Sequence, residues 1–387
     1  MSAPIPHFRN ELLSAIDQAE IVSFDIFDTL IVRCYEKPTD LFRHIEQSLN
    51  RGNFAELRMG AEKNARHKAR AEQRQETTLD EIYAELPVHW QYLKQIEIDQ
   101  ELASCSRDAV MFEFYNYALT RNKKILLASD MYLPIEVVSR IVGNAGYGGY
   151  EKILLSSQTG RQKATGALFD DIIEAANVSS DKILHIGDNS LGDYHMAQQR
   201  GLKAFLYIPA VETFGAIAEA PLFRTLDEKP YSASIVTSLL KGLVFQYNMR
   251  NANPDYWKKF GFVYGGLLAY GFCVWIKEQC DREKITDIYF AARDGFLFKK
   301  VFDQLYPGLK THYLYASRRC YLLANSKEVD ADFLYHVAHK NTIEGNLGYW
   351  TVRDFMTQLA LESKSIKDAY INEFPNQEEV VRQPEQL

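Results

Sequence analysis

The stretch IVSFDIFDTL, residues 21–30, decides the fold that we predict for the first half of the chain. Its apolar run ends at Asp25, and a second carboxylate, Asp28, follows beside Thr29. Short runs rich in Ile, Val and Phe are typical of strands buried on both faces. Carboxylates at the end of such a strand are costly to bury unless a cation or hydrogen bonds compensate them. The stretch therefore predicts a buried strand that leads into a functional site.

Strand and helix signals alternate after residue 120. We expect short apolar strands at 123–130, 152–157, 182–188 and 203–208, with helices at 134–142, 167–176 and 193–200. This alternation is typical of an α/β fold with a doubly wound, Rossmann-like parallel sheet. In such sheets the functional residues lie beyond the carboxyl ends of the strands. Asp25, Ser129 and Asp188 all stand at such ends.

Helix formers dominate from about residue 38 to residue 120. Thr78 and Glu81 have the spacing of a capping box, which predicts a helix start at that point. The run 62–76, rich in Lys, Arg and Glu, is expected to be a solvated helix face, with contact to an anionic substrate as the alternative. In the sheet, we expect Asp130 to cap the turn before Pro134, and His185 to be packed rather than catalytic.

Composition and charge exclude several classes of protein. The formal net charge of −7 gives no basic footprint, so nucleic acid is not expected as a partner. The five cysteines are odd in number and scattered, which favours reduced thiols in a cytoplasmic protein. No signal peptide is expected from the N-terminal residues. The apolar segment 260–276 is too short for a membrane span, so we expect a buried helix there.

The residues at the strand ends indicate a metal site. Four acids (Asp25, Asp28, Asp188 and Asp193), the Ser129 hydroxyl and Lys163 are expected to converge at one edge of the sheet. Crowded carboxylates need a cation or must bind protons. A cluster of oxygen ligands without His or Cys favours a hard ion, and we expect Mg²⁺. With this ion, a carboxylate can attack a phosphoryl group and form an aspartyl-phosphate intermediate.

These motifs resemble those of the haloacid dehalogenase superfamily, whose members are mostly phosphatases. The first motif, an apolar strand ending in Asp-x-Asp-x-Thr, is matched by Asp25 and Thr29 in FDIFDTL. A strand ending in Ser or Thr is matched by Ser129, and a basic residue ahead of a helix by Lys163. The acidic pair after an apolar strand is matched in HIGDNSLGD. The four motifs occur in order and cover roughly residues 20–210.

The resemblance implies roles for individual residues. Asp25 would be the nucleophile, with Asp28 as the second catalytic candidate. The metal ligands would be Asp25, the backbone carbonyl of Phe27, Asp188 and, as an outer ligand, Asp193. The substrate-binding residues would be Ser129, Lys163, Thr29 and Asn189. A helical insert at 33–120 would be a cap that covers the site and selects the substrate.

One position departs from the family motif. The second Asp, the usual general acid and base, is replaced by Phe27, and Asp28 stands one residue later. Because side chains alternate along a strand, Asp28 would face away from the site unless the loop bends. Whether Asp28 replaces the missing acid stays open. Dehalogenase members carry an aromatic residue near this place, so a metal-independent 2-haloacid dehalogenase is the alternative to the phosphatase.

The predicted domains are a core formed by 1–32 and 121–210, the cap 33–120, a linker 211–230 and a C-terminal α/β region 231–387. In that region, YFAARDGFLF and YASRRC give a looser resemblance to larger bacterial proteins of this superfamily found beside glycosyltransferase domains in surface-polysaccharide synthesis. Its expected role is a scaffold, through a homodimer or a glycosyltransferase partner, with a second ligand site around Arg293 or Arg318–Arg319 as the alternative.

The sequence thus predicts a cytoplasmic, Mg²⁺-dependent phosphohydrolase that acts on a small phosphorylated metabolite such as a sugar phosphate. The alternative from another class is a non-catalytic module that binds a phosphorylated glycan intermediate or a partner enzyme.

Overall fold

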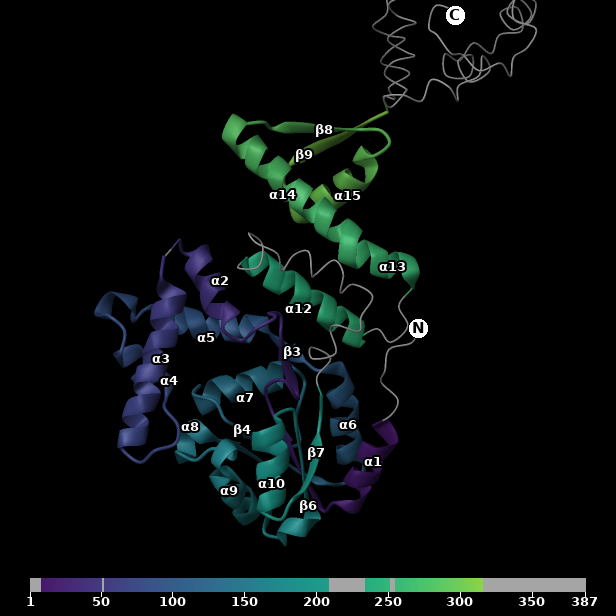
Figure 1. Cartoon of the computed structure of the whole chain (residues 1–387). Coiled ribbons are helices and arrows are strands. Elements are labelled where there is room, and N and C mark those ends of the chain that lie inside the picture. The colour runs from purple at the N-terminus through teal and green to yellow at the C-terminus, as the bar shows by residue number, and fades with distance from the viewer. Residues whose placement is uncertain (1–7, 51, 209–233, 251–254, 316–387) are drawn as a thin grey trace, which may run out of the picture. The chain divides into compact units, whose positions relative to one another are not determined.

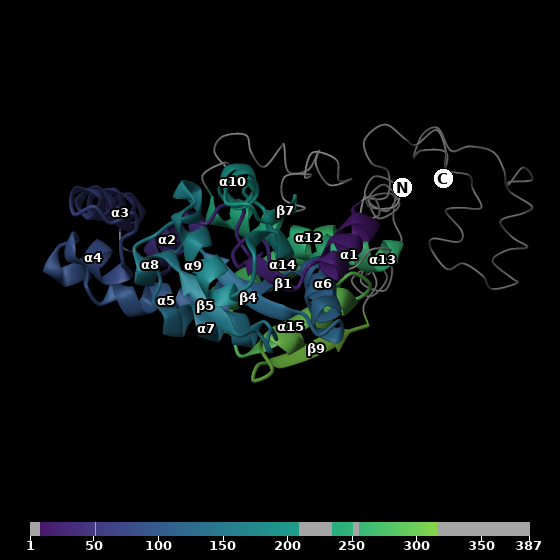
Figure 2. The same cartoon turned by 90° about the horizontal axis from the view of Figure 1, so that it is seen from below.

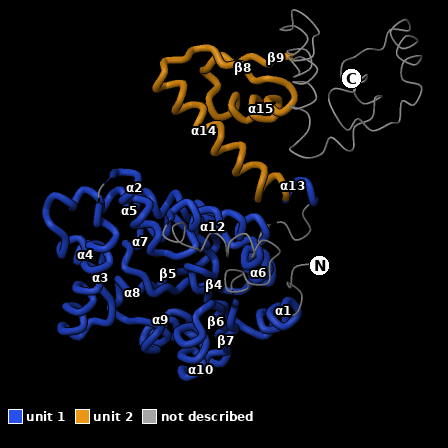
Figure 3. Tube along the Cα trace, turned by 45° about the horizontal axis from the view of Figure 1, so that its top comes forward, with its two compact units in different colours: residues 1–259 blue, residues 260–387 orange. Residues whose placement is uncertain are grey.

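The computed structural model describes residues 8–50, 52–208, 234–250 and 255–315 (Figure 1). The chain divides into two compact units, Met1–Lys259 and Phe260–Leu387 (Figure 3). The predicted linker 211–230 and the pair Arg318–Arg319 lie outside the described residues.

The first unit is built on a five-stranded parallel sheet in the order β5-β4-β1-β6-β7. The strands are β1 (Ile21–Asp25), β4 (Lys124–Ser129), β5 (Lys152–Leu155), β6 (Ile183–Gly187) and β7 (Lys203–Leu206). Strand β1 is central and all five of its residues are buried, as its apolar sequence predicts. The predicted α/β class with a doubly wound parallel sheet is therefore confirmed.

Helices cover both faces of this sheet. Helices α1 (Arg9–Gln18), α6 (Ala109–Thr120) and α7 (Ile135–Asn144) pack with Val22 and Phe24 of β1. Helices α9 (Ala167–Ala176) and α10 (Met196–Gln199) pack with Ile21. Helices α7 and α10 lie on opposite sides of the sheet (Figure 2). Because side chains alternate along a strand, Ser23 and Asp25 belong to the face covered by α9 and α10.

A helical cap is inserted between two short strands. Strand β2 (Ile31–Arg33) pairs antiparallel with β3 (Cys105–Arg107). Between them lie α2 (Asp40–Ser48), α3 (Phe54–Ala71), α4 (Leu79–Ala84), the 3₁₀ turn Val88–Trp90 and α5 (Leu93–Ser104). The predicted capping box is present, since Thr78 and Glu81 satisfy each other's backbone N–H groups at the start of α4.

Two helices pack with a different part of the structure from the one to which the predicted domain limits assign them. Helix α6, within the predicted cap range, packs against α1 and β4 and so belongs with the sheet. Helix α12 (Ile235–Arg250), within the predicted C-terminal region, packs against α2 and α6 of the first unit. There Ser238 Oγ accepts from the Glu36 N–H at 2.9 Å and donates to Asp40 at 2.7 Å.

The described part of the second unit is a β-α-β arrangement. Strands β8 (Asp287–Ala291) and β9 (Lys310–Leu314) are parallel, and α15 (Gly295–Leu305) connects them. Phe290, Phe302 and Cys273 of α14 (Gly266–Glu283) form the core. Both strands and helices are therefore present in the described part of this unit, as expected for an α/β region.

The apolar segment before β8 differs from its prediction. The continuous helix Tyr256–Glu283 is long and apolar enough to cross a membrane by length and composition, which is weak evidence by itself. In the described part of the chain only 17% of its most apolar window is buried, and the Leu268 side chain is 70% exposed. The expected burial of this helix is therefore wrong for the residues that the structure describes.

Candidate active site

A buried lysine and two buried aspartates form the centre of the site. Asp25 ends strand β1, and Lys163 begins the short 3₁₀ turn Lys163–Thr165; each is 4% exposed. The Lys163 ammonium donates to Asp25 Oδ1 and, over 2.5 Å, to Asp193 Oδ1. Burial lowers the pKa of Lys163, but the charges of Asp193 and Asp25 outweigh burial and raise this pKa above its usual range. The lysine is therefore held as a cation.

The turn that carries Lys163 is anchored by Asp130. The Asp130 carboxylate accepts from the backbone N–H of Lys163 at 2.8 Å and of Ala164 at 3.2 Å. The prediction that Asp130 caps the turn before Pro134 is wrong, because its carboxylate binds a loop some 30 residues later in the chain. A charge-assisted bond to backbone N–H groups is strong, so Asp130 fixes where the lysine leaves the backbone.

Three carboxylates gather beside the lysine. Ligand oxygens of Asp25, Asp188 and Asp193 all lie within 4.8 Å of one another. Burial, together with the charges of Asp193 and Asp188, raises the pKa of Asp25 well above its usual range, although Lys163 opposes this. Burial and the charges of Asp28 and Asp193 raise the pKa of Asp188 to about 7. This all-oxygen donor set with excess negative charge fits a hard divalent cation such as Mg²⁺.

The third carboxylate, Asp193, remains charged. It lies on the π-helical turn Ser190–His195 that follows β6, and burial alone would raise its pKa. Lys163 and His185 reverse the direction and hold the pKa of Asp193 well below its usual range. Its Oδ2 also accepts from the Asn189 N–H at 3.0 Å. Gly187 is required beneath it, because a Cβ there would stand 2.4 Å from the Asp193 carboxylate carbon.

His185 supports Asp193 from inside the sheet. It is fully buried and packs edge-on against Phe169, with 5.0 Å between ring centroids, in line with the expected packing role. Its Nε2 lies 3.2 Å from Asp193 Oδ1, and its Nδ1 lies 3.0 Å from Ser23 Oγ. Burial lowers the pKa of His185. Strand alternation puts Ser23 and Asp25 on one face of the sheet, and the register places His185 opposite Ser23 on that face.

The predicted substrate-binding residues differ in what their side chains contact. Ser129 ends β4, is buried, and follows Ala128, which lies opposite Asp25 in the sheet register. Thr29 Oγ1 donates to Asp188 Oδ1 at 3.3 Å. Asn189 Oδ1 accepts from two backbone N–H groups, of Leu191 at 3.0 Å and Gly192 at 2.8 Å. The Asn189 oxygen therefore caps the π-helical turn.

The loop after β1 bends, so Asp28 does not follow strand alternation. Asp28 has a left-handed backbone with φ of 60°, and its N–H donates to the Ile31 carbonyl at 2.7 Å. Burial raises the pKa of Asp28, Arg33 opposes the shift, and Glu101 adds to it. Asp28 is close enough that its charge raises the pKa of Asp188. The bend therefore removes the alternation that would turn Asp28 away from the site.

Phe27 lies beneath a buried ion pair. The Arg33 guanidinium lies 4.4 Å from the Phe27 ring centroid, a cation–π distance. Arg33 also donates to both oxygens of Glu101, at 3.0 and 3.3 Å. The residue that replaces the acid of the motif is thus fixed against the base of the cap.

The charged run 62–76 is only partly a solvated face. Lys63 and Arg70 are exposed, but Glu76 is 2% exposed and forms an ion pair with the half-buried Arg66. A hollow of about 340 Å³ lies beside this run and is lined by Thr39, Met59, Glu62, Lys63, Arg66 and Arg70. The expectation of a fully solvated face is wrong at Glu76, because a run of charges does not reveal which of them turns inward.

No protein-family model matches the sequence, and no curated protein matches it. Solved structures resemble about half of the chain at low identity. One is described as a HAD-hydrolase, YfnB, of Bacillus subtilis bound to magnesium (16% identity, 50% of this chain and 90% of that chain, TM-score 0.39). Others are a 2-haloacid dehalogenase of Pseudomonas syringae (18%, 49% and 87%, TM-score 0.36) and a HAD phosphatase of Thermococcus onnurineus (14%, 49% and 86%, TM-score 0.35).

Proposed function

We propose that the chain is a Mg²⁺-dependent phosphohydrolase that acts on a small phosphorylated metabolite through an aspartyl-phosphate at Asp25. One observation carries this proposal: the buried Asp25 carboxylate is bonded to Lys163 and has two further carboxylates within 4.8 Å. A nucleophilic carboxylate beside a fixed cation is the arrangement that phosphoryl transfer requires, because the reaction depends mainly on positioning and on charge stabilisation.

In the proposed phosphoryl transfer, Asp25, Lys163 and Ser129 have separate roles. Lys163 holds Asp25 Oδ1, so the other oxygen, Oδ2, is the proposed nucleophile. A bond forms from Oδ2 to phosphorus while the bond from phosphorus to the ester oxygen breaks. Lys163 and Ser129 would stabilise the phosphoryl oxygens. Water then attacks phosphorus, which releases inorganic phosphate and restores the Asp25 carboxylate.

The metal would be held by Asp25 and Asp188, with the Phe27 carbonyl completing the protein ligands and Asp193 as an outer ligand. When bound, Mg²⁺ neutralises negative charge on the phosphoryl group and on the carboxylates. The raised pKa values of Asp25 and Asp188 support this assignment, because they reflect burial together with neighbouring carboxylate charge, which Lys163 alone does not offset.

Asp28 is the proposed general acid for the leaving group and base for the attacking water. Two features support this role: the left-handed turn at Asp28, which breaks the strand alternation, and a raised pKa, which increases the protonated fraction. General acid catalysis contributes roughly a hundredfold or more.

A metal-independent dehalogenase is the second candidate, and Phe27 is the observation that favours it. In that reaction Asp25 would attack carbon and displace halide, and the Asp25 ester would then be hydrolysed. The acid cluster weighs against this candidate, because burial and the charges of Asp28 and Asp193 raise the pKa of Asp188 although Lys163 opposes the shift, so the lysine leaves carboxylate charge that a metal-free reaction would not use.

The test is a panel of phosphate esters and 2-haloacids assayed with Mg²⁺ and with EDTA, using Asp25→Asn as the control. We expect phosphate release that needs Mg²⁺ and is lost in Asp25→Asn. Halide release in EDTA would support the dehalogenase instead. Turnover of no compound by the wild-type protein, or phosphate release retained in Asp25→Asn, would overturn the proposal.

A further inference from the structure

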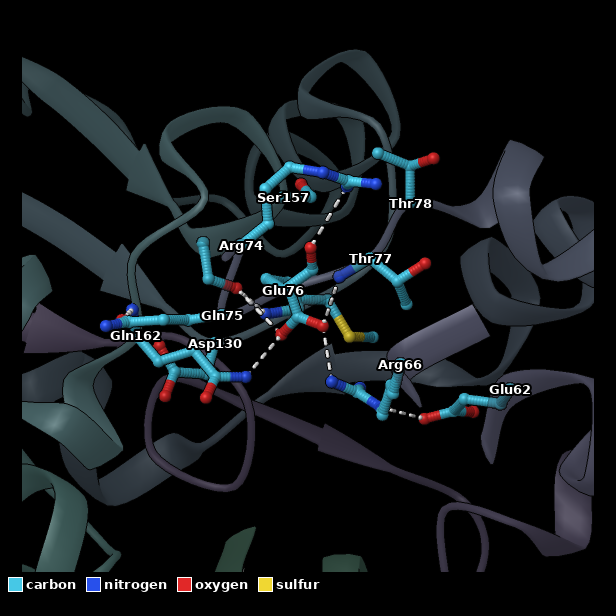
Figure 4. Close-up of polar contacts among 12 residues, drawn as sticks. Glu62, Arg66, Arg74, Gln75, Glu76, Thr77, Thr78, Asp130, Ser157 and Gln162 are labelled. Atoms are coloured by element: carbon cyan, nitrogen blue, oxygen red, sulfur yellow. Dashed lines mark hydrogen bonds and ion pairs between the residues drawn. The ribbon is translucent and has the colours of Figure 1, made fainter. Parts of the chain in front are cut away.

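Two consecutive cap residues contact the core loop that carries the site lysine. Gln75 and Glu76 lie between α3 and α4, and the loop is residues 156–165, between β5 and α9. Glu76 Oε2 accepts from Ser156 Oγ at 3.0 Å and from Gln162 Nε2 at 3.1 Å (Figure 4). A cap carboxylate therefore bonds to both ends of the segment that precedes Lys163.

Glu76 is itself firmly fixed. Its side chain is 2% exposed, and its other oxygen, Oε1, accepts from Arg66 and from the Thr77 N–H at 2.9 Å (Figure 4). Four donors thus surround one buried carboxylate. Because an unpaired buried charge is costly, a carboxylate satisfied in this way has little freedom to move.

Gln75 holds the backbone of the same loop. Its N–H donates to the Gly160 carbonyl at 2.9 Å. Its Oε1 accepts from the Gln162 N–H at 2.9 Å and from Thr165 Oγ1 at 2.7 Å. The cap contacts therefore lie on both sides of Lys163 in the sequence.

The core holds the loop from the other side. Asp130 accepts from the N–H groups of Lys163 and Ala164, and Ser156 Oγ accepts from the Met131 N–H at 2.9 Å. Asp130 and Met131 directly follow Ser129 at the end of β4. The lysine turn is thus clamped between the end of a core strand and the cap.

We propose that Gln75 and Glu76 are positioning residues: by clamping the loop 156–165 to the cap, they place the Lys163 ammonium between Asp25 and Asp193. The catalytic consequence rests on the proposed function, whereas the effect on the loop does not. Among the described residues, neither Gln75 nor Glu76 has a hydrogen bond to Asp25 or Asp193, so each acts through the loop. The charged run 62–76, which contains Gln75 and Glu76, then helps to position Lys163.

The main variant is Glu76→Gln, which places an amide NH₂ among four donors and so leaves at least one of them without an acceptor. We expect kcat to fall about 10–100-fold, the cost of a misplaced catalytic group, with a much smaller change in KM. The matched control is Glu62→Gln. Glu62 also pairs with Arg66, at 3.0 Å, and it lies on α3 without a described contact to the loop.

A second variant and a rescue separate positioning from folding. Gln75→Ala removes two hydrogen bonds to the loop without touching a buried charge, so it keeps the test open if Glu76→Gln does not fold. The double variant Glu76→Gln with Gln162→Glu restores a donor and an acceptor across the 76–162 contact. We expect it to recover part of the lost kcat.

Two readouts do not need turnover. Hydrogen exchange reports opening of the loop 156–165, and acylation by acetic anhydride followed by mass spectrometry reports exposure of the Lys163 amine. We expect both to rise about tenfold or more in Glu76→Gln and Gln75→Ala and to stay at the wild-type level in Glu62→Gln, because each lost buried hydrogen bond lowers the cost of local opening.

Unchanged exchange and labelling in folded Glu76→Gln and Gln75→Ala would overturn the proposal, as would equal increases in Glu62→Gln. If the wild-type protein turned over no phosphate ester, the proposed function would fail, but exchange and labelling would still decide whether the cap positions Lys163.

Discussion

Lys163 and Asp193 form a buried ion pair, with 2.5 Å between Nζ and Oδ1, and the same ammonium donates to Asp25. The lysine comes from a loop after β5, and the aspartate comes from the turn after β6. One cation therefore joins the ends of three strands.

Lys163→Met should destabilise the protein more at high pH than at low pH. Without the ammonium, two buried carboxylates lose their partner, a loss worth about 3–5 kcal/mol. Their folded-state pKa values then rise above the unfolded values, so the folded variant binds extra protons and its free energy of unfolding falls as pH increases. Urea unfolding at pH 5 and pH 8, without metal, measures this. A variant deficit that is equal at both pH values would contradict the account.

Mg²⁺ should stabilise the wild-type protein in the absence of any substrate. Ligand binding to the folded state at a hundredfold excess over Kd adds about 3 kcal/mol to the free energy of unfolding. Asp188→Asn should remove most of this gain while leaving the metal-free protein as stable as the wild type or more so, because burial disfavours the Asp188 charge. Thermal unfolding with Mg²⁺ and with EDTA is the measurement. The same gain in both proteins would exclude Asp188 as a ligand.

Asp28→Asn should affect substrates according to their leaving groups. An alkyl phosphate needs a proton on the departing oxygen, so we expect kcat to fall about a hundredfold. An aryl phosphate with a good leaving group, such as p-nitrophenyl phosphate, needs less help, so the burst of phenol release should change little. Pre-steady-state kinetics with both ester types make the comparison. An equal loss for the two substrates would assign Asp28 a structural role.

Asp108, a residue outside the active site, should make the free energy of unfolding depend on pH. It caps α6 and accepts from the Tyr207 hydroxyl at 2.8 Å, and burial raises its pKa from 3.8 to about 6. The folded protein therefore binds more protons between these values, and the free energy of unfolding falls by on the order of 3 kcal/mol as pH rises from 4 to 7.

Asp108→Asn should flatten this pH dependence, because an Asn oxygen can still cap the helix but carries no charge. Urea unfolding over pH 4–7 would show it, with the exposed Asp99→Asn as the matched control. A slope in Asp108→Asn as steep as that of the wild type would show that other groups cause it.

The sequence was a good guide to the core of the fold, for a physical reason. Strands buried on both faces must be almost wholly apolar, so β1 was visible as a run, and the polar residue that ended it marked the sheet edge. The order of the parallel strands then brought Asp25, Lys163 and Asp193 together. The predicted convergence of these three residues is what the hydrogen bonds describe.

Contacts between distant loops could not be predicted in the same way. An Asp placed shortly before Pro134 is typical of a turn cap, and only the fold reveals that Asp130 binds the Lys163 turn. Asn189 is predicted to bind substrate, and only the fold reveals that its Oδ1 also caps the following turn. Glu76 lies in a run of charged residues. Which of these side chains becomes buried depends on how α3 and α4 pack against the core. Short-range patterns do not encode such pairings.

The covalent intermediate at Asp25 tests the central claim most directly. Wild-type protein mixed with a turned-over phosphate ester and Mg²⁺ would be quenched in acid, reduced with borohydride and digested. We predict that mass spectrometry will find residue 25 converted to homoserine, the reduction product of an acyl phosphate, with no conversion in EDTA or without substrate. Phosphate release with Asp25 unmodified under every quench condition, or conversion at Asp28 instead, would contradict the account.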